Sequence, residues 1–353
     1  MMIIRPITSA DLPALLKLIK SAGIGLTTLP SNEAALSLRI EASNASFAGR
    51  AQKADELFLF VLEDARARRV VGTCGLASAV GLREAWYSYR VGLAVHASQE
   101  LAVFTQTQTL FLSNDHTGQS ELCSLFLDPD YRRDRNGNLL SKSRLLFLAQ
   151  HRERFSKKII AELRGVSDEN GHSPFWESLG RRFFSMEFSQ ADYLTGIGKK
   201  SFVAELMPKH PLYTSFLTPE AQAAIGQTHP HTVPARRMLE GEGFRYEGYV
   251  DIFDAGPTVE CDVEDVSAVA HCRKLKTVIS NLTPADDALI YLVSSIGMDN
   301  YRATLVTATP VGDEFPLHSE TAEAMSVAAG DEVCAVPLTI SDRHYPHPSR
   351  RMG

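Results

Sequence analysis

The segment from Leu125 to Ala149, LFLDPDYRRDRNGNLLSKSRLLFLA, constrains the fold more than any other stretch of the chain. Its start has the composition of a buried strand, its middle holds three arginines and the letters NGN, and its end has the apolar spacing of a helix. A strand, a turn and a helix in this order bring free backbone N–H groups and the positive end of the helix dipole to one point. The segment therefore predicts an α/β fold with an anion-binding turn, and phosphate groups suit such a turn.

Two familiar phosphate-binding motifs are missing from the sequence. It contains no G-x-x-x-x-G-K-[ST], and no G-x-G-x-x-G follows a predicted strand. The turn therefore belongs to neither the nucleotide-binding P-loop class nor the dinucleotide-binding class.

Composition excludes several other functions. The chain has 353 residues, a length typical of about two domains. Its net charge of −6 argues against binding to nucleic acid or to an anionic membrane, since both require a basic surface. No apolar stretch is long enough to cross a bilayer. Five scattered cysteines without a C-x-x-C pair predict reduced, mostly buried thiols, no zinc site and a cytoplasmic protein without a leader.

Apolar periodicity predicts a mixed α/β chain. Strands are expected over residues 2–8, 57–64, 70–80, 87–97, 101–112, 121–132, 158–165, 200–208, 291–296, 302–311 and 332–340, with one more aromatic strand directly after residue 184. Helices are expected over residues 9–23, 32–48, 138–155, 173–184, 218–227, 232–244 and 260–276. Ser9 and Thr232 are the predicted N-caps of two of these helices, and Gly23 is the predicted stop of the first.

The pattern of elements also predicts the domain organisation. Residues 1–254 should form an α/β domain with a mixed sheet, interrupted by an insertion over about residues 81–117. Residues 255–353 should form a small β-rich region that ends in a loose tail rich in Pro, His and Arg.

In outline, the Leu125–Ala149 segment resembles the pyrophosphate-binding arm of the GNAT superfamily of acyl-CoA transferases. Pro129 and Arg132 match its strand end, Gly137 matches the second glycine of R-x-x-G-x-G, and Leu139 starts its helix. Arg135 stands where the first glycine is expected. The resemblance implies a GNAT-like fold and a coenzyme A substrate.

Over nearly the whole chain, longer stretches resemble the arginine N-succinyltransferases. They include GLTTLPSNEAAL, TLFLSNDHTGQSELCSLFLDPDYR, SKSRLLFLAQHRERF, AELRGVSDENGHSPFWESLGRRFFSMEFSQADYLTG and YVDIFDAGPTVECD. The resemblance implies transfer of succinyl from succinyl-CoA, a co-substrate and not a resident cofactor, to the α-amine of L-arginine. It implies no metal. It places a succinyl-CoA contact at Leu125, and we expect the neighbouring positions to share in it: Leu127, Arg132, Asn136 and Gly137.

Aminolysis of a thioester needs a proton acceptor for the amine, a donor for the oxyanion and a proton for the leaving thiolate. A backbone N–H at Leu125 can serve as the oxyanion donor. No covalent intermediate is required, so Cys123 is interpreted as a packed thiol.

Eleven histidines compete for proton transfer. His151 is interpreted as part of a solvated helix face, and His116 and His172 as residues that stabilise turns. His229 lies in THPHT, where Pro230 restrains it to an extended conformation. The residues alone favour a capping or surface role for it, whereas the resemblance implies that His229 is the proton donor.

Recognition of the two substrates stays open at this level. The guanidinium of arginine needs a carboxylate, for which the sequence offers Asp115, Glu121, Glu162, Asp168, Glu169 and Asp251. The succinyl carboxylate needs a cation, for which Arg90 and Arg164 are candidates. We expect an oligomer of this chain or with a related chain. Two alternatives remain: an acyltransferase of the same fold with another donor or amine, such as ornithine, and a non-catalytic subunit that binds coenzyme A.

Overall fold

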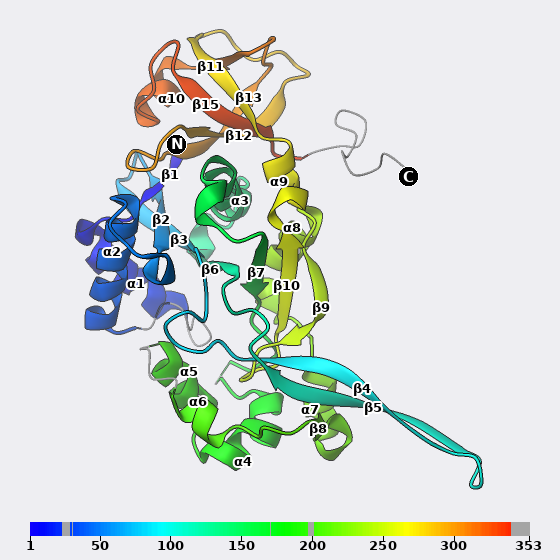
Figure 1. Ribbon diagram of the computed structural model, residues 1–353. Coiled ribbons are helices and arrows are strands. Elements are labelled where there is room, and N and C mark those ends of the chain that lie inside the picture. Colours follow the sequence, from blue (N-terminus) through cyan, green and yellow to red (C-terminus); the bar gives the residue numbers. More distant parts are fainter. Residues whose placement is uncertain (23–28, 30, 170, 197–200, 340–353) are drawn as a thin grey trace.

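The computed structural model describes residues 1–22, 29, 31–169, 171–196 and 201–339. These residues form helices packed on both sides of one long, twisted, mixed sheet (Figure 1). The strands of the described part of the chain lie in the spatial order β14 (Glu314–Leu317), β11 (Arg273–Ile279), β15 (Glu332–Pro337), β12 (Leu289–Ser295), β13 (Ala303–Ala308), β1 (Met2–Pro6), β2 (Leu57–Asp64), β3 (Arg69–Ala77), β6 (Ser120–Leu127), β7 (Lys158–Glu162), β10 (Pro257–Asp262), β9 (Arg245–Val250), β4 (Ser88–Ser98), β5 (Val103–Ser113) and β8 (Leu212–Tyr213).

The predicted mixed α/β class is confirmed. The α-helices are α1 (Leu12–Ala22), α2 (Glu33–Phe47), α3 (Asn136–Gln150), α4 (Arg181–Phe184), α5 (Phe188–Gly196), α6 (Ser201–Leu206), α7 (Pro219–Ala224), α8 (Val233–Gly241), α9 (Ser267–Ala270) and α10 (Ser319–Ala324). Most neighbouring strands run antiparallel, but β6 and β7 are parallel, as are β11 and β14.

Strand β2 shows why the sheet is covered on both faces. Phe58, Phe60 and Leu62 pack in one cluster with α3, while Leu57, Leu59 and Val61 pack in another with α1 and α2. Alternate side chains of a strand point to opposite faces, so a continuous apolar run such as LFLFVL indicates burial on both sides.

The C-terminal strands are joined to the first part of the chain through α3. Tyr301 is fully buried, and its hydroxyl donates to the backbone carbonyl of Ser143 in α3 at 2.6 Å. Its ring lies 5.2 Å from Phe147 and 5.4 Å from Phe60. Strand β13 also pairs with β1, so the sheet continues across the junction.

The predicted insertion forms a hairpin. Strands β4 and β5 lie between β3 and β6 in the chain, pair along eleven residues each, and project from the body as a long arm (Figure 1). Beyond the predicted boundary at residue 254, strand β10 pairs with both β7 and β9 in the middle of the sheet. The sheet is thus continuous across residue 254. The division of the chain into two domains at this residue stays a prediction.

Three predicted elements are wrong. The aromatic strand after residue 184 is helix α5, because Phe188 and Ala191 pack at helical spacing beside Trp176. The strand over residues 200–208 contains helix α6. The helix over residues 260–276 is limited to α9, since residues 257–262 and 273–279 join the sheet as β10 and β11.

Smaller expectations at the N-terminus differ too. The N-cap of the first helical turn is Thr8 and not Ser9, because the Asp11 carboxylate accepts hydrogen bonds from the Thr8 N–H and hydroxyl at 2.8 and 2.9 Å. Thr232 is confirmed as the N-cap of α8. The predicted stop at Gly23 and the predicted loose tail fall outside the described residues.

Candidate functional site

Strands β6 and β7 begin as a parallel pair and then separate. Their pairing is limited to Ser120 with Ile159 and Glu121 with Ile160. Within the described part of the chain, the β7-facing edge of β6 from Leu122 to Leu127 therefore has no strand partner. Leu125 is half-buried and Leu127 is buried on this segment. A separated pair can leave main-chain groups open to a ligand, and Leu125, where the resemblance implies a succinyl-CoA contact, lies on this segment.

A β-bulge lies in the separated part of β6. Ser124 has a φ of 56°, and the register with β3 shifts so that two residues of β6 oppose one residue of β3. Arg144 of α3 is buried beneath the bulge, and its Nη1 donates to the carbonyls of Cys123 at 3.3 Å and Gly75 at 3.4 Å. The guanidinium thus holds the backbone of both β6 and β3 at the residue pair that precedes the bulge.

The basic turn, residues Asp128–Arg135, follows β6 directly. It contains a 3-10 turn at Pro129–Tyr131, and Asp128 caps this turn by accepting the Asp130 N–H at 3.1 Å. Arg132 Nε donates to the Leu127 carbonyl at 3.2 Å, and Asn136 Nδ2 donates to the Tyr131 carbonyl at 3.0 Å. These bonds give the turn a defined shape.

Helix α3 begins with free N–H groups. No hydrogen-bond acceptor among the described residues serves the backbone N–H of Gly137 or of Asn138. A Cβ built on Gly137 would meet no protein atom within 4 Å. The side chains of Arg132, Arg133 and Arg135 are exposed around this point. The structure therefore brings together Arg132, Asn136 and Gly137 as predicted, in an arrangement suited to an anion.

His229 lies beside the other separated strand. Its backbone N–H donates to the carbonyl of Arg164 at 2.8 Å, just after β7. Continuing the β6–β7 register would set Arg164 opposite Leu125 across the gap. His229 caps the 3-10 turn Pro230–Thr232 in an extended conformation, as Pro230 predicted, and its Nδ1 accepts the His231 N–H at 3.2 Å.

The surroundings of the His229 ring favour its neutral form. Only 9% of the residue is exposed, and burial, followed by the positive charges of Arg164 and His231, lowers the pKa of His229 below its ordinary value. Because Nδ1 accepts a hydrogen bond, the neutral ring carries its proton on Nε2.

The other predicted histidines have structural surroundings. His116 is buried and contacts Glu260 through Nε2 at 3.2 Å and Ser88 through Nδ1 at 3.3 Å, which ties the hairpin arm to β10. The prediction of a solvated face for His151 is wrong, because its ring packs against Phe147 and burial lowers its pKa. His172 pairs with Asp168 on the surface.

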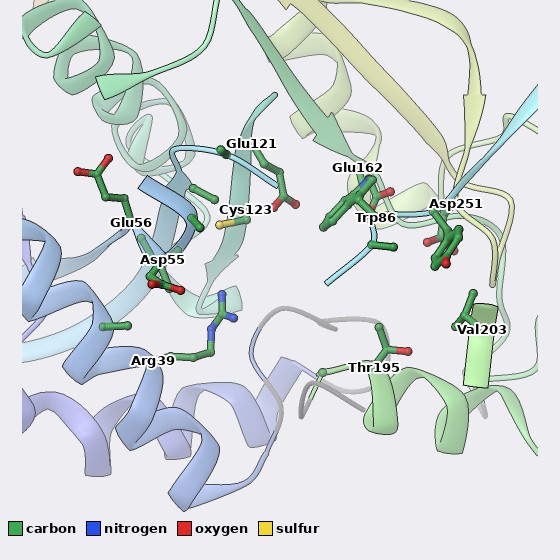
Figure 2. Close-up of a pocket in the computed structure, with 18 of the residues that line it drawn as sticks. Arg39, Asp55, Glu56, Trp86, Glu121, Cys123, Glu162, Thr195, Val203 and Asp251 are labelled. Atoms are coloured by element: carbon green, nitrogen blue, oxygen red, sulfur yellow. The ribbon is translucent and has the colours of Figure 1, made fainter. Parts of the chain in front are cut away.

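A cavity of about 430 Å³ adjoins the bulge. It is lined by residues of α2, the segment before β2, β6, β7, the loop before β4, α5, α6 and the turn after β9 (Figure 2). The charged lining residues are Arg39, Asp55, Glu56, Glu121, Glu162 and Asp251. Figure 2 shows Arg39, Asp55 and Glu56 on one side, Glu162 and Asp251 on the other, and Glu121 between them.

Three of the six carboxylates considered from the sequence line this cavity: Glu121, Glu162 and Asp251. Burial raises the pKa of Asp251, while backbone N–H groups of Asp254 and Phe253 oppose that rise. Asp115 instead accepts the Tyr249 hydroxyl at 2.7 Å, and the exposed Asp168 and Glu169 lie elsewhere.

Two other sequence expectations concern cysteine and arginine. Cys123 is buried in the apolar cluster with α1 and α2, as expected of a packed thiol, and burial raises its pKa to about 12. Arg90 stacks on Tyr249 and Arg164 donates to Ser167, and neither lines the cavity. Arg39, which does line it, was missed because it lies inside an ordinary helix with no local motif around it.

The residues that the structure describes form neither a metal-binding cluster nor a membrane-spanning helix. Those residues contain no cluster of three His, Cys, Asp or Glu side chains suited to a metal ion. None of their helices is long and apolar enough to span a membrane.

Comparison with known proteins covers nearly the whole chain. Residues 2–268 match the family model described as arginine N-succinyltransferase beta subunit, and residues 273–337 match the model of the C-terminal domain of that subunit. The chain is 54% identical over 342 residues to arginine N-succinyltransferase subunit beta of Pseudomonas aeruginosa, which covers 97% of this chain and 100% of the relative. It is 53% identical over 338 residues to the arginine N-succinyltransferase of an Enterobacter species, which covers 96% and 98%.

One solved structure is similar throughout. It is that of arginine/ornithine succinyltransferase subunit AI from Pseudomonas aeruginosa, with a TM-score of 0.88 and 33% sequence identity. The match covers 96% of this chain and 99% of that chain.

Proposed function

The chain belongs to the arginine N-succinyltransferase family, and on this premise we propose that it transfers the succinyl group of succinyl-CoA to the α-amine of L-arginine. The chain is an acyltransferase, and the products are N2-succinylarginine and coenzyme A. The observation that carries the proposal is the mixed-charge cavity beside the bulge in β6. The basic turn after β6 suits a phosphorylated carrier, and the carboxylates that line the cavity suit a cationic amino acid.

Coenzyme A occupies the basic turn and the open edge of β6 in this proposal. Its pyrophosphate accepts hydrogen bonds from the N–H groups of Gly137 and Asn138, with Arg132 nearby, while Asn136 holds the turn in shape. The pantetheine arm runs along Leu127 and Leu125. The thioester then lies at the bulge, where a backbone N–H of β6 stabilises the developing oxyanion.

Arginine enters from the cavity. Its guanidinium is bound by the carboxylates of Glu121, Glu162 and Asp251. A bound cation would favour the charged form of Asp251, whose pKa burial raises. The α-amine is thereby turned toward the thioester carbon.

His229 manages the proton. The amine nitrogen bonds to the thioester carbon, the carbon–sulfur bond breaks, and the proton lost by the amine reaches the sulfur through the imidazole. A lowered pKa suits this task, since the neutral ring can take up a proton and its charged form releases it readily.

The experiment that tests this function is thiol release from acyl-CoA by the purified chain. Succinyl-CoA with L-arginine should release thiol far faster than acetyl-CoA with L-arginine, and faster than succinyl-CoA without an amine. A preference for L-ornithine would assign the other acceptor. Tight coenzyme A binding with no release in any combination would favour the non-catalytic subunit instead.

The role of His229 predicts the pH dependence of this reaction. Replacing His229 with Ala should lower kcat by about 10²–10⁴-fold. In the unchanged protein, kcat should fall as the pH decreases through the lowered pKa, so the acid limb should lie below about pH 6.5. Stopped-flow or steady-state pH profiles measure both effects.

His231 provides the matched control. His231→Ala keeps the backbone N–H that His229 accepts but removes a charge that lowers its pKa, so the acid limb should move slightly upward with kcat retained. If His231→Ala loses activity and His229→Ala does not, the proton donor has been assigned to the wrong histidine.

Gly137 tests the placement of coenzyme A. The Cβ that Gly137→Val adds meets no protein atom within 4 Å, so the melting temperature of the free protein should not change. The affinity for coenzyme A should fall by about tenfold or more, because charge-assisted hydrogen bonds are blocked. Calorimetry measures the affinity. Gly241→Val, in α8 with equally open surroundings, is the control, and equal affinity in both variants would show that the pyrophosphate binds elsewhere.

We further propose that the protein is cytoplasmic and works as an oligomer, with copies of itself or with a related chain. The hairpin arm supports association. Leu93, Val95 and Phe104 lie on one face of it and are 61%, 52% and 65% exposed. A two-stranded hairpin with an uncovered apolar face is marginally stable in water, so a partner surface would stabilise it.

The assembly is tested by substitution on the two faces of the arm. The double variant Leu93→Ser/Phe104→Ser should reduce the molar mass measured by light scattering, whereas Thr105→Ser, on the opposite face, should leave it unchanged. A monomeric unchanged protein would remove the assembly from the proposal without affecting the reaction.

A further inference from the structure

Arg39 is the one cation among the residues that line the cavity in the described part of the chain. It extends from α2 toward the strand that carries Cys123 (Figure 2). Its Nε is buried and has no hydrogen-bond partner, and among the described residues its guanidinium takes part in no ion pair. Arg39 is half-buried, and a buried N–H donor without an acceptor is costly, so this position is explained better by a ligand than by packing.

The carboxylates on the same side of the cavity already have partners. Asp55 pairs with Arg83, whose Nε lies 2.7 Å from Oδ1, and this contact lowers the pKa of Asp55. Glu56 pairs with Arg154. Neither neighbour therefore depends on Arg39 for its charge balance.

The position of Arg39 relative to the bulge indicates which anion it would meet. Arg39 and Cys123 line the same cavity, and Arg39 extends toward the strand that carries Cys123 (Figure 2). Cys123 directly precedes Ser124, the positive-φ residue of the bulge where the thioester is proposed to lie. An acyl chain that extends past the thioester into the cavity thus reaches the side of Arg39, while the carboxylates of Glu162 and Asp251 lie opposite.

We propose that Arg39 binds the terminal carboxylate of the acyl group and so selects a dicarboxylic acyl donor. This inference rests on the proposed function. A guanidinium and a carboxylate form two parallel, charge-assisted hydrogen bonds. A donor that ends in a methyl group leaves the guanidinium, with its buried Nε, without an acceptor, and the site discriminates against it for that reason. Arg39 is a specificity-determining residue, and the chemical step itself does not use it.

The test removes the charge from the protein and from the substrate in turn. Arg39→Met keeps a long unbranched side chain without the charge. It should lower kcat/KM for succinyl-CoA by roughly 30- to 1000-fold. With butyryl-CoA, which has the same four-carbon length and no carboxylate, the variant and the unchanged protein should differ by less than about threefold. Arg39→Lys should restore part of the loss.

Arg50→Met is the matched control. Arg50 follows α2 by three residues, is exposed and does not line the cavity, so this variant should keep the kinetics of the unchanged protein with both donors. The affinity for coenzyme A itself should be the same in all variants.

A second comparison separates the two carboxylates of the reaction. If Arg39→Met loses activity equally with both acyl donors, and the loss disappears when L-argininamide replaces L-arginine, Arg39 binds the α-carboxylate of the amine and the inference is overturned. An equal loss in every combination would also overturn it, because Arg39 would then be structural. Absence of succinyl transfer in the unchanged protein is a different result, which rejects the proposed function and not this residue alone.

Discussion

The early separation of β6 from β7 is the constraint on which the rest of the site depends. Parallel strands in the middle of a sheet normally pair along their length, yet these two share only two residue pairs. The separation coincides with the bulge, where Ser124 takes a positive φ and the edge of β6 turns away. Such a backbone persists only when its surroundings hold it, and Arg144 supplies that support from below through two carbonyls. A fully buried arginine is expensive, and desolvation lowers its pKa, so its presence marks how firmly the bulge must be fixed.

The same separation brings the basic turn and His229 to one edge of the sheet. Because β6 and β7 are parallel, their carboxyl ends lie side by side, and the segments that leave these two ends meet each other. The basic turn and α3 come after β6, and the segment that anchors His229 comes after β7. The tight packing near that anchor is required by the backbone: a Cβ on Gly256 would lie 2.1 Å from the Leu163 carbonyl. His229, the proposed proton-transfer residue, is therefore placed by its backbone hydrogen bond to Arg164 and by the hydrogen bond that its ring accepts from the His231 N–H.

Local sequence was sufficient for part of this arrangement and insufficient for the rest. The strand–turn–helix at Leu125–Ala149 and the extended conformation of His229 were predictable, because a few adjacent residues determine them. Helices α5 and α6 were not, since short amphipathic segments of six to nine residues satisfy strand and helix periodicity almost equally. Arg39 was missed for a different reason: its role depends on which strand faces α2 across the fold. No pattern in LSLRIEAS indicates that its Nε is left without a partner.

The departure at Arg135 bears on whether the turn can still bind phosphate. A glycine at this place would be favoured because the backbone adopts a left-handed conformation, and Arg135 adopts that conformation with a φ of 62° and ψ of 18°. The strain of a non-glycine residue there is about 1 kcal/mol and is offset by the hydrogen bonds of the turn. Its side chain is exposed to solvent, and no protein atom lies within 4 Å of a Cβ built on Gly137. The presence of arginine in place of glycine thus changes the charge beside the proposed anion-binding turn without closing it.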